Sequence, residues 1–313
     1  MRVLLINPNT SRAMTEKIAE AAREVAGPDV LIEAVCPADG ADAIESHTDE
    51  IAAAAAVVEL ITADRAGADP ADAYVIACFG DPGLDAAREL VEAPVVGIAE
   101  AAMHLAAVSG RHFGVVTTLS RTLGRAHDLV SRYGMERACV SLAATGIPVL
   151  DLEDTGSPAV ETIARVSAEA AASGADVIVL GCAGMADLCT ELTARVGVPV
   201  VDGVAAAVGV ASGMVRMGLG TSKRDEYAPP PRALVAGASA GRVSAVPAGG
   251  ASGFGARSDV RGGPFPPRGA ESAPDRESSA ASSAPDRESS AASSAPDRES
   301  PAPPQAGDLA VFA

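Results

Sequence analysis

The sequence has no tryptophan and only five Phe and three Tyr, so aromatic side chains make up 3% of the chain. Its hydrophobic core must therefore be aliphatic, with Ala, Val and Leu as the main contributors. Basic residues are also few, because 24 Lys and Arg stand against 41 Asp and Glu, for a formal net charge of −17. Nucleic acids and anionic membrane surfaces both attract clustered Lys and Arg. We therefore expect neither a nucleic-acid partner nor a membrane partner.

Long hydrophobic segments are missing as well. The longest apolar stretch, residues 204–215, is shorter than the roughly 18–20 residues that a membrane-spanning helix needs. The apolar run at residues 3–6 ends at Asn7-Pro8, well short of the core of a signal peptide. A cytoplasmic protein is expected, and in that reducing compartment the five cysteines should be thiols. These cysteines also lack the CxxC or Cys/His pairing of a zinc site, so no metal is expected.

Short apolar runs alternate with helical segments over residues 1–227. The expected strands cover residues 3–6, 30–35, 73–77, 94–98, 113–117, 177–180 and 198–201. The expected helices, the first capped by Thr10 or Ser11, run to residue 25 and over 49–64, 85–91, 122–133, 161–173, 185–196 and 205–217. Solidly apolar strands that alternate with helices predict parallel sheets covered on both faces, which is the α/β class.

The pattern restarts near residue 101, which makes the two parts of the chain weak internal repeats. Each part has a buried-type strand followed by a cysteine, Cys78 after Ala-Tyr-Val-Ile-Ala and Cys182 after Ala-Asp-Val-Ile-Val-Leu-Gly. A glycine, a helix and a Pro-Val-Val strand follow in both, with 16 residues from Cys to Pro in the first part and 17 in the second. The sequence therefore predicts two similar α/β halves with parallel sheets related by pseudo-twofold symmetry.

The first predicted half covers residues 1–100 and is completed by about 203–225, and the second covers 101–202. Open parallel sheets bind ligands at the carboxyl ends of their strands. Both cysteines are therefore expected at an active site in the cleft between the halves.

The last part of the chain, residues 228–313, has a different composition, rich in Pro, Gly, Ser and Ala. Within it, Ser-Ala-Pro-Asp-Arg-Glu-Ser begins at Ser272, Ser283 and Ser294, a period of 11 residues. Such a period can mark a right-handed coiled coil, but a proline recurs in every unit and there is no apolar seam. A disordered low-complexity tail is therefore predicted.

Cys78 and Cys182 each precede a glycine-rich turn from strand to helix. Backbone amides in such a turn, and in the first turn of a helix, can face an anion. A thiol near a helix N-terminus can have its pKa lowered from about 8.5, which yields thiolate at neutral pH. One such cysteine alone would more often be structural, but a pair at equivalent positions indicates function. Cys36, Cys139 and Cys189 are interpreted as structural.

Residues 1–225 resemble the aspartate/glutamate/hydantoin racemase superfamily, and most closely its hydantoin/allantoin racemase branch. The segments that carry the resemblance are Asn7-Pro8-Asn9-Thr10-Ser11, Ile44-Glu45-Ser46, Cys78-Phe79-Gly80-Asp81-Pro82-Gly83-Leu84, Thr117-Thr118 and Leu180-Gly181-Cys182-Ala183-Gly184-Met185. The Cys-Asn-Thr and Gly-Cys-Thr-His motifs of glutamate racemases are absent. Aryl-malonate decarboxylases of the superfamily keep one of the two thiols, whereas this chain has both. Ala43 departs from the branch, where a serine is expected before Ile-Glu-Ser.

The resemblance implies a cofactor-independent racemase of 5-substituted hydantoins or allantoin. Two bases on opposite faces of a carbon acid can remove a proton and return it on the other side, and Cys78 and Cys182 would be these bases. The substrate-binding residues implied are Asn9, Thr10, Ile44, Glu45, Gly80, Thr117, Thr118, Gly181 and Ala183. A small-molecule substrate, no cofactor, no metal and a homo-oligomer are expected.

Other interpretations stay open at this stage. A maleate cis–trans isomerase also has two thiols, another amino-acid racemase of the superfamily would share the fold, and a non-catalytic small-molecule binding protein could be built on the same two halves. Several of the polar residues also have structural interpretations. Asn9 and Thr10 could form a helix-entry turn, Thr117 and Thr118 could cap a helix, and Glu45 could be a solvated loop carboxylate. Asp81 and His47 are interpreted as surface residues.

Overall fold

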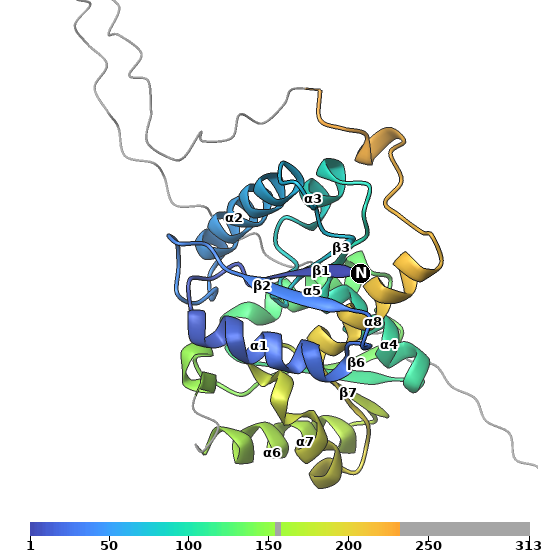
Figure 1. Ribbon diagram of the computed structural model, residues 1–313. Coiled ribbons are helices and arrows are strands. Elements are labelled where there is room, and N and C mark those ends of the chain that lie inside the picture. The colour runs from blue at the N-terminus through green and yellow to red at the C-terminus, as the bar shows by residue number, and fades with distance from the viewer. Residues whose placement is uncertain (154–157, 232–313) are drawn as a thin grey trace, which may run out of the picture. The chain divides into compact units, whose positions relative to one another are not determined.

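The structure of the chain is a computed structural model, which describes residues 1–153 and 158–231 (Figure 1). Within these residues, eight strands form two four-stranded sheets in which all neighbouring strands are parallel. The first sheet has the order β2-β1-β3-β4 and the second β6-β5-β7-β8, so both halves have the same strand order. The predicted α/β class with two similar parallel-sheet halves is therefore confirmed.

The strands are β1 (Arg2–Ile6), β2 (Leu31–Val35), β3 (Ala73–Ile76), β4 (Val95–Gly97), β5 (Phe113–Thr117), β6 (Cys139–Ala144), β7 (Val177–Leu180) and β8 (Val200–Val201). The α-helices are α1 (Arg12–Val25), α2 (His47–Arg65), α3 (Leu84–Leu90), α4 (Ile98–Ser109), α5 (Leu123–Arg132), α6 (Ala159–Ala172), α7 (Cys189–Val196) and α8 (Gly203–Arg216). Short 3₁₀ segments are η1 (Ser120–Thr122), η2 (Val149–Glu153), η3 (Ala183–Leu188) and η4 (Asp225–Tyr227).

Both faces of each sheet are covered, because successive residues of a strand point to opposite faces. In β1, Val3 and Leu5 pack in a core with α1 and α8, while Leu4 and Ile6 pack against α2 and α3 on the other face. One face of the second sheet joins that first core, and its other face packs against α6 and α7. The core shared by both sheets fixes the positions of their strand ends.

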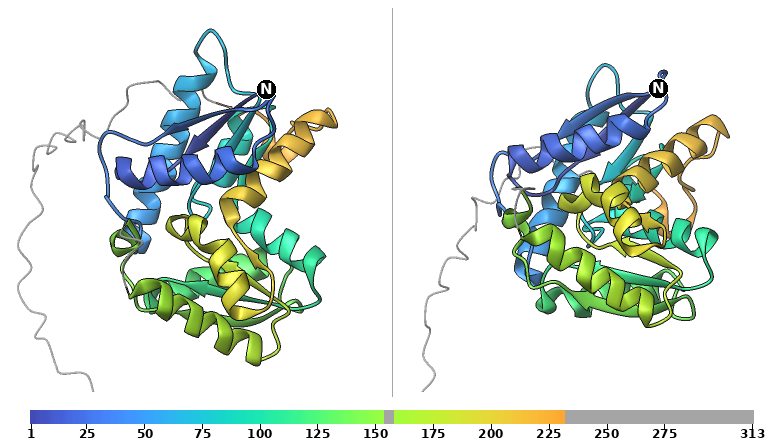
Figure 2. Two further views of the ribbon diagram at one scale, coloured as in Figure 1. Left: turned by 60° about the horizontal axis from the view of Figure 1, so that its bottom comes forward. Right: turned by 90° about the horizontal axis from the view of Figure 1, so that it is seen from below.

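Helices α4 and α8 pack against each other in this shared core (Figure 2). Helix α4 follows the first sheet in the chain and contacts β5, β7 and β8 of the second sheet. Helix α8 follows the second sheet and contacts β3 and β4 of the first. The two halves therefore exchange a helix, which joins them more closely than a linker would.

The sequence pattern does not predict two of the elements. Helix α4 begins directly after β4, without a loop, and its exposed side carries Leu105 and Val108, which hides an amphipathic period. Strand β6 is an edge strand with no buried position, and its residues do not form a solidly apolar run. In addition, the helix expected from residue 185 begins at Cys189, because η3 forms first. The tail predicted for residues 228–313 lies, beyond residue 231, outside the described residues.

Candidate active site

A cavity of about 210 Å³ lies at the carboxyl ends of the central strands of both sheets. Asn7 follows β1, Cys78 follows β3, Thr117 ends β5 and Cys182 follows β7, and all four line the cavity. The other lining residues are Asn9, Met14, Ile18, Ile44, Glu45, Ser46, His47, Glu50, Ala77, Phe79, Gly80, Thr118, Arg121, Thr122, Arg125, Ala126, Val149, Gly181, Ala183 and Gly184. The crevice is therefore at the strand ends of two parallel sheets, where such folds bind ligands.

Most residues expected to bind substrate line this cavity, namely Asn9, Ile44, Glu45, Gly80, Thr117, Thr118, Gly181 and Ala183. Thr10 does not line it. Its backbone N–H and its hydroxyl both donate to the Ala41 carbonyl, at 3.0 and 3.4 Å. Thr10 therefore holds the loop before α2 rather than facing the cavity.

The two thiols lie at equivalent positions in the two halves. Each cysteine comes two residues after the end of its strand and is half-buried. The backbone N–H of the residue two positions later, Gly80 for Cys78 and Gly184 for Cys182, lowers the pKa of each thiol. These amides stabilise negative charge on the sulfurs, as the glycine-rich turns predict.

The net effect on the thiol pKa values is opposite to the sequence prediction. Burial raises the pKa of Cys78 to about 12, and the nearby Cys182, Asp81 and Glu50 add to this, while the Gly80 N–H lowers it. Burial raises the pKa of Cys182 to about 11, with the Gly184 N–H and Lys17 lowering it. The expected lowering fails because the effect of burial outweighs that of the two backbone amides. Both groups are therefore thiols at neutral pH.

The turn after β1 fixes the orientation of Asn9. Asn7 Nδ2 donates to Asn9 Oδ1 at 2.7 Å and to Thr15 Oγ1 at 2.9 Å. The Ser11 N–H also donates to Asn9 Oδ1, at 2.9 Å. With its oxygen engaged, Asn9 has its NH₂ group left to donate. Asn7 is buried and was not singled out from the sequence, although it belongs to the same Asn-Pro-Asn turn.

Glu45 connects the two halves beside the cavity. Its Oε1 accepts a hydrogen bond from the Val149 N–H at 2.9 Å, between residues 104 positions apart in the chain. The Glu45 backbone N–H donates to Asp49 Oδ2 in the first turn of α2. Glu45 is thus half-buried and bonded, not a freely solvated loop carboxylate.

Charged residues that the sequence did not indicate form another part of the wall. Arg125 Nη2 donates to the Gly80 carbonyl at 2.7 Å and pairs with Glu50 Oε1 at 2.6 Å. Arg121, one helical turn earlier, also lines the cavity. The four-residue spacing of the two arginines after β5 places them on one helix face and could have indicated this wall. Charged residues near a helix start are more often solvated, however, so the spacing alone did not single them out.

Asp81 is the clearest correction to the sequence interpretation. It was expected to be a solvated turn residue, yet it is 3% exposed and accepts three hydrogen bonds. Burial raises its pKa to about 6, while the Tyr133 hydroxyl and the backbone N–H groups of Ala99 and Glu100 lower it. Asp81 is therefore part of the structural support of the cavity wall.

Residues 3–211 match the family model described as Asp/Glu/Hydantoin racemase. The chain belongs to this family. It is 42% identical to a hydantoin racemase of Paenarthrobacter aurescens over 232 residues, which cover 74% of this chain and 98% of the relative. An allantoin racemase from Klebsiella pneumoniae has 48% identity and a TM-score of 0.73, covering 76% of this chain and 97% of that one. An allantoin racemase from Pseudomonas fluorescens has 42% identity and a TM-score of 0.72, covering 75% and 99%.

Membership of this family makes the chain a racemase, an isomerase that acts on a small molecule. The non-catalytic binding protein that the sequence left open is therefore wrong. Across residues 1–153 and 158–231, no group of three or more His, Cys, Asp and Glu side chains could hold a metal ion. Among the same residues, no helix is long and apolar enough to cross a membrane.

Proposed function

We propose that this racemase interconverts the enantiomers of 5-substituted hydantoins or of allantoin without a cofactor, with Cys78 and Cys182 as the two bases. The observation that carries the proposal is the position of the two thiols. They follow equivalent strands of the two sheets and line one cavity, and in each a backbone N–H two residues later lowers the thiol pKa. The similarity to hydantoin and allantoin racemases supports the substrate class.

In the proposed reaction, one cysteine enters as thiolate and the other as thiol. The thiolate removes the proton from C5 of the ring, and the electron pair is delocalised into the adjacent C4 carbonyl as an enolate. The second thiol then donates its proton to the opposite face of C5. The first cysteine ends as thiol and the second as thiolate, so the proton count balances and the reverse direction uses the same steps.

The raised thiol pKa values suit this chemistry. A weak carbon acid needs a strong base, and a thiolate whose protonated form is stabilised by burial is a stronger base than an exposed thiolate. The same burial keeps most enzyme molecules in the inactive form with two thiols at neutral pH. The backbone amides of Gly80 and Gly184 offset part of this effect.

The remaining wall residues would bind the ring. The Asn9 NH₂ group, the Thr118 hydroxyl and the amides of the two cysteine turns are the donors for the ring carbonyls and the developing enolate oxygen. Ile44 and Val149 would contact the ring through apolar surface. Glu45 would keep the two halves in register around the substrate, through its hydrogen bond to Val149.

Polarimetry tests this proposal directly. The full chain is incubated without added cofactor with each enantiomer of 5-isopropylhydantoin and, separately, of allantoin. The rotation of at least one of these substrates should decay to zero from both starting enantiomers, faster than in the blank without enzyme. Maleate, assayed in parallel for conversion to fumarate, should be unchanged. No enzymatic loss of rotation with either ring would contradict the proposal.

A further inference from the structure

Asp81 lies in the turn that follows Cys78 and is tied to that cysteine through the backbone. The Asp81 N–H donates to the Cys78 carbonyl at 2.9 Å, which closes a four-residue turn. The φ of Asp81 is 44°, in the left-handed region that residues other than glycine rarely adopt. Specific contacts must therefore hold Asp81 in place, and a shift of Asp81 would also move Cys78.

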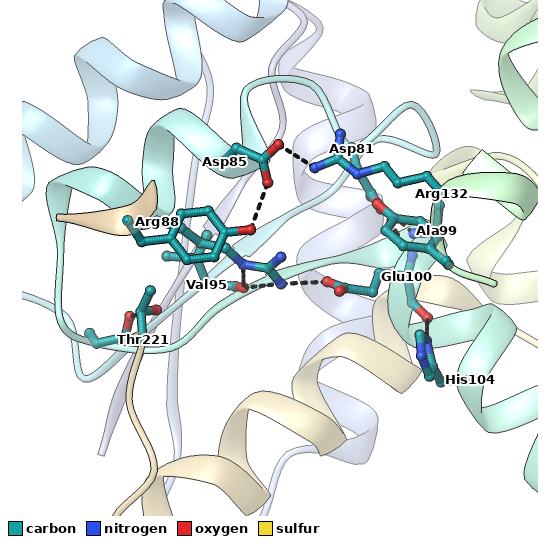
Figure 3. Close-up of polar contacts among 12 residues, drawn as sticks. Asp81, Asp85, Arg88, Val95, Ala99, Glu100, His104, Arg132 and Thr221 are labelled. Atoms are coloured by element: carbon teal, nitrogen blue, oxygen red, sulfur yellow. Dashed lines mark hydrogen bonds and ion pairs between the residues drawn. The ribbon is translucent and has the colours of Figure 1, made fainter. Parts of the chain in front are cut away.

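Those contacts come from the Asp81 carboxylate (Figure 3). Its Oδ1 accepts from the Ala99 N–H at 3.0 Å, and its Oδ2 accepts from the Glu100 N–H at 2.9 Å and from the Tyr133 hydroxyl at 2.6 Å. The two N–H groups belong to the first turn of α4, where they have no partner within the helix. One buried carboxylate thus anchors the Cys78 turn both to α4 and to Tyr133, the C-cap residue of α5.

The second half caps its equivalent helix locally. Asp202 follows β8 directly and accepts from the N–H groups of Val204 and Ala205, at 3.0 and 2.7 Å. Gly97, the last residue of β4, is likewise the N-cap residue of α4, and both N-cap residues have a φ of −84°. A Cβ at Gly97 would overlap the Asp81 carboxylate. The first half therefore caps α4 from the cysteine turn, whereas the second half caps α8 from its own N-cap residue.

The two cysteine turns consequently differ in what holds them. Met185 stands three residues after Cys182, as Asp81 does after Cys78, and it is fully buried in an apolar core. The Cys182 turn is thus held by packing, and the Cys78 turn by a carboxylate. Arg125 adds a further polar contact to the Cys78 turn, at the Gly80 carbonyl.

We infer that Asp81 is the positioning residue of the Cys78 thiol, and that this dependence on a buried carboxylate is not shared by Cys182. The inference rests on the proposed two-thiol racemisation. Through the Cys78–Asp81 turn, the carboxylate sets where the Cys78 sulfur lies relative to the Gly80 N–H and to the substrate carbon. Loss of the carboxylate should impair proton transfer on one face of the substrate only.

The test measures deuterium incorporation at C5, in heavy water, from each enantiomer of the substrate found by polarimetry. Cys78→Ser and Cys182→Ser in the full chain first define which enantiomer each thiol serves. Asp81→Asn should then reduce incorporation into the Cys78-dependent enantiomer at least tenfold, with KM changed less than about threefold. Incorporation into the Cys182-dependent enantiomer should stay within about threefold of the wild-type rate. Asp202→Asn, which weakens the equivalent cap on α8, should lower the melting temperature. It should leave the incorporation rates of both enantiomers within about threefold of the wild-type rates.

A double variant separates positioning from capping. Asp81→Gly combined with Gly97→Asp moves the carboxylate to the place that Asp202 has in the second half. This variant should melt at a higher temperature than Asp81→Gly alone, yet keep the deficit at the Cys78-dependent enantiomer. If the double variant recovered the Cys78-dependent rate as well as the stability, the inference would be overturned. Asp81 would then affect the rate only by stabilising α4.

Equal slowing of both enantiomers by Asp81→Asn would overturn it too. If Asp81→Asn does not fold, Tyr133→Phe removes one anchor and should slow the Cys78-dependent enantiomer alone, and an equal effect on both enantiomers would again overturn the inference. A failure of the proposed function would be distinct, because the two cysteine variants would then not divide the enantiomers between them.

Discussion

The Thr117 hydroxyl donates to the Gly181 carbonyl at 3.0 Å, joining the ends of β5 and β7 beside Cys182. The two residues are so close that a Cβ at Gly181 would lie 2.8 Å from Thr117 Cβ and 3.1 Å from Thr117 Cα. Backbone and a β-branched side chain cannot easily move away, so only glycine fits here. The residue before the Cys182 thiol is therefore fixed by this close approach.

Gly181→Ala should destabilise the protein by about 1–3 kcal/mol, as overpacking of a buried site does, and reduce kcat by displacing Cys182. The matched control is Gly209→Ala in α8, where a Cβ meets nothing within 4 Å. That change should stabilise the protein by about 0.5–1 kcal/mol, because glycine is unfavourable inside a helix, and should leave kcat unchanged. Urea unfolding and racemisation assays measure both effects. A Gly181→Ala variant with wild-type stability and kcat would contradict this account of the contact.

The pH dependence of kcat/KM should rise through the neutral and mildly alkaline range. In the proposed mechanism, the free enzyme loses one proton from a thiol pair whose pKa values burial raises to about 12 and about 11. An acid with a raised pKa stays protonated to higher pH, so the active form increases with pH. Between about pH 6.5 and 8.5, log kcat/KM should increase with a slope near one. A kcat/KM that has already reached a plateau at neutral pH would contradict the assignment of raised pKa values to the two thiols.

Two charged residues near Cys182 should move this profile in opposite directions. Glu45 raises the pKa of Cys182 and Lys17 lowers it. Glu45→Gln keeps an acceptor for the Val149 N–H but removes the charge, and should shift the rising limb to lower pH. Lys17→Met should shift it to higher pH. Profiles of kcat/KM for the two variants are compared with the wild type, and shifts in the same direction would refute the electrostatic assignment.

The repeat in the sequence made much of the site predictable. Cys78 and Cys182 could be paired because each follows an apolar strand and precedes a glycine, a helix and Pro-Val-Val. Parallel sheets with the same strand order place such residues at one edge, which is why the cavity lies where the strands were expected to end.

Other features depend on long-range contacts that local patterns do not carry. From the sequence, Asp81 was interpreted as a solvated turn residue. In the structure it caps α4, a helix that the sequence did not predict, by accepting hydrogen bonds from two of its N–H groups. Thr10 belongs to a motif that carried the resemblance, yet it does not line the cavity, and its hydroxyl donates to the Ala41 carbonyl. The thiol pKa values were expected to fall because the turns are glycine-rich, but burial outweighs the amides. These contacts and the burial of the thiols depend on the tertiary structure, so local sequence patterns could not predict them.

The central claim is that Cys78 and Cys182 act on opposite faces of one carbon atom. Its most direct test is deuterium incorporation at C5 in heavy water by Cys78→Ser and by Cys182→Ser, followed separately for each enantiomer and corrected for the blank rate. A serine hydroxyl is far less acidic than a thiol and cannot complete the relay, so neither variant should racemise the substrate. Each should still incorporate deuterium, without inversion, into one enantiomer, and the two variants should select opposite enantiomers. Near wild-type racemisation by either variant, or selection of the same enantiomer by both, would contradict the claim.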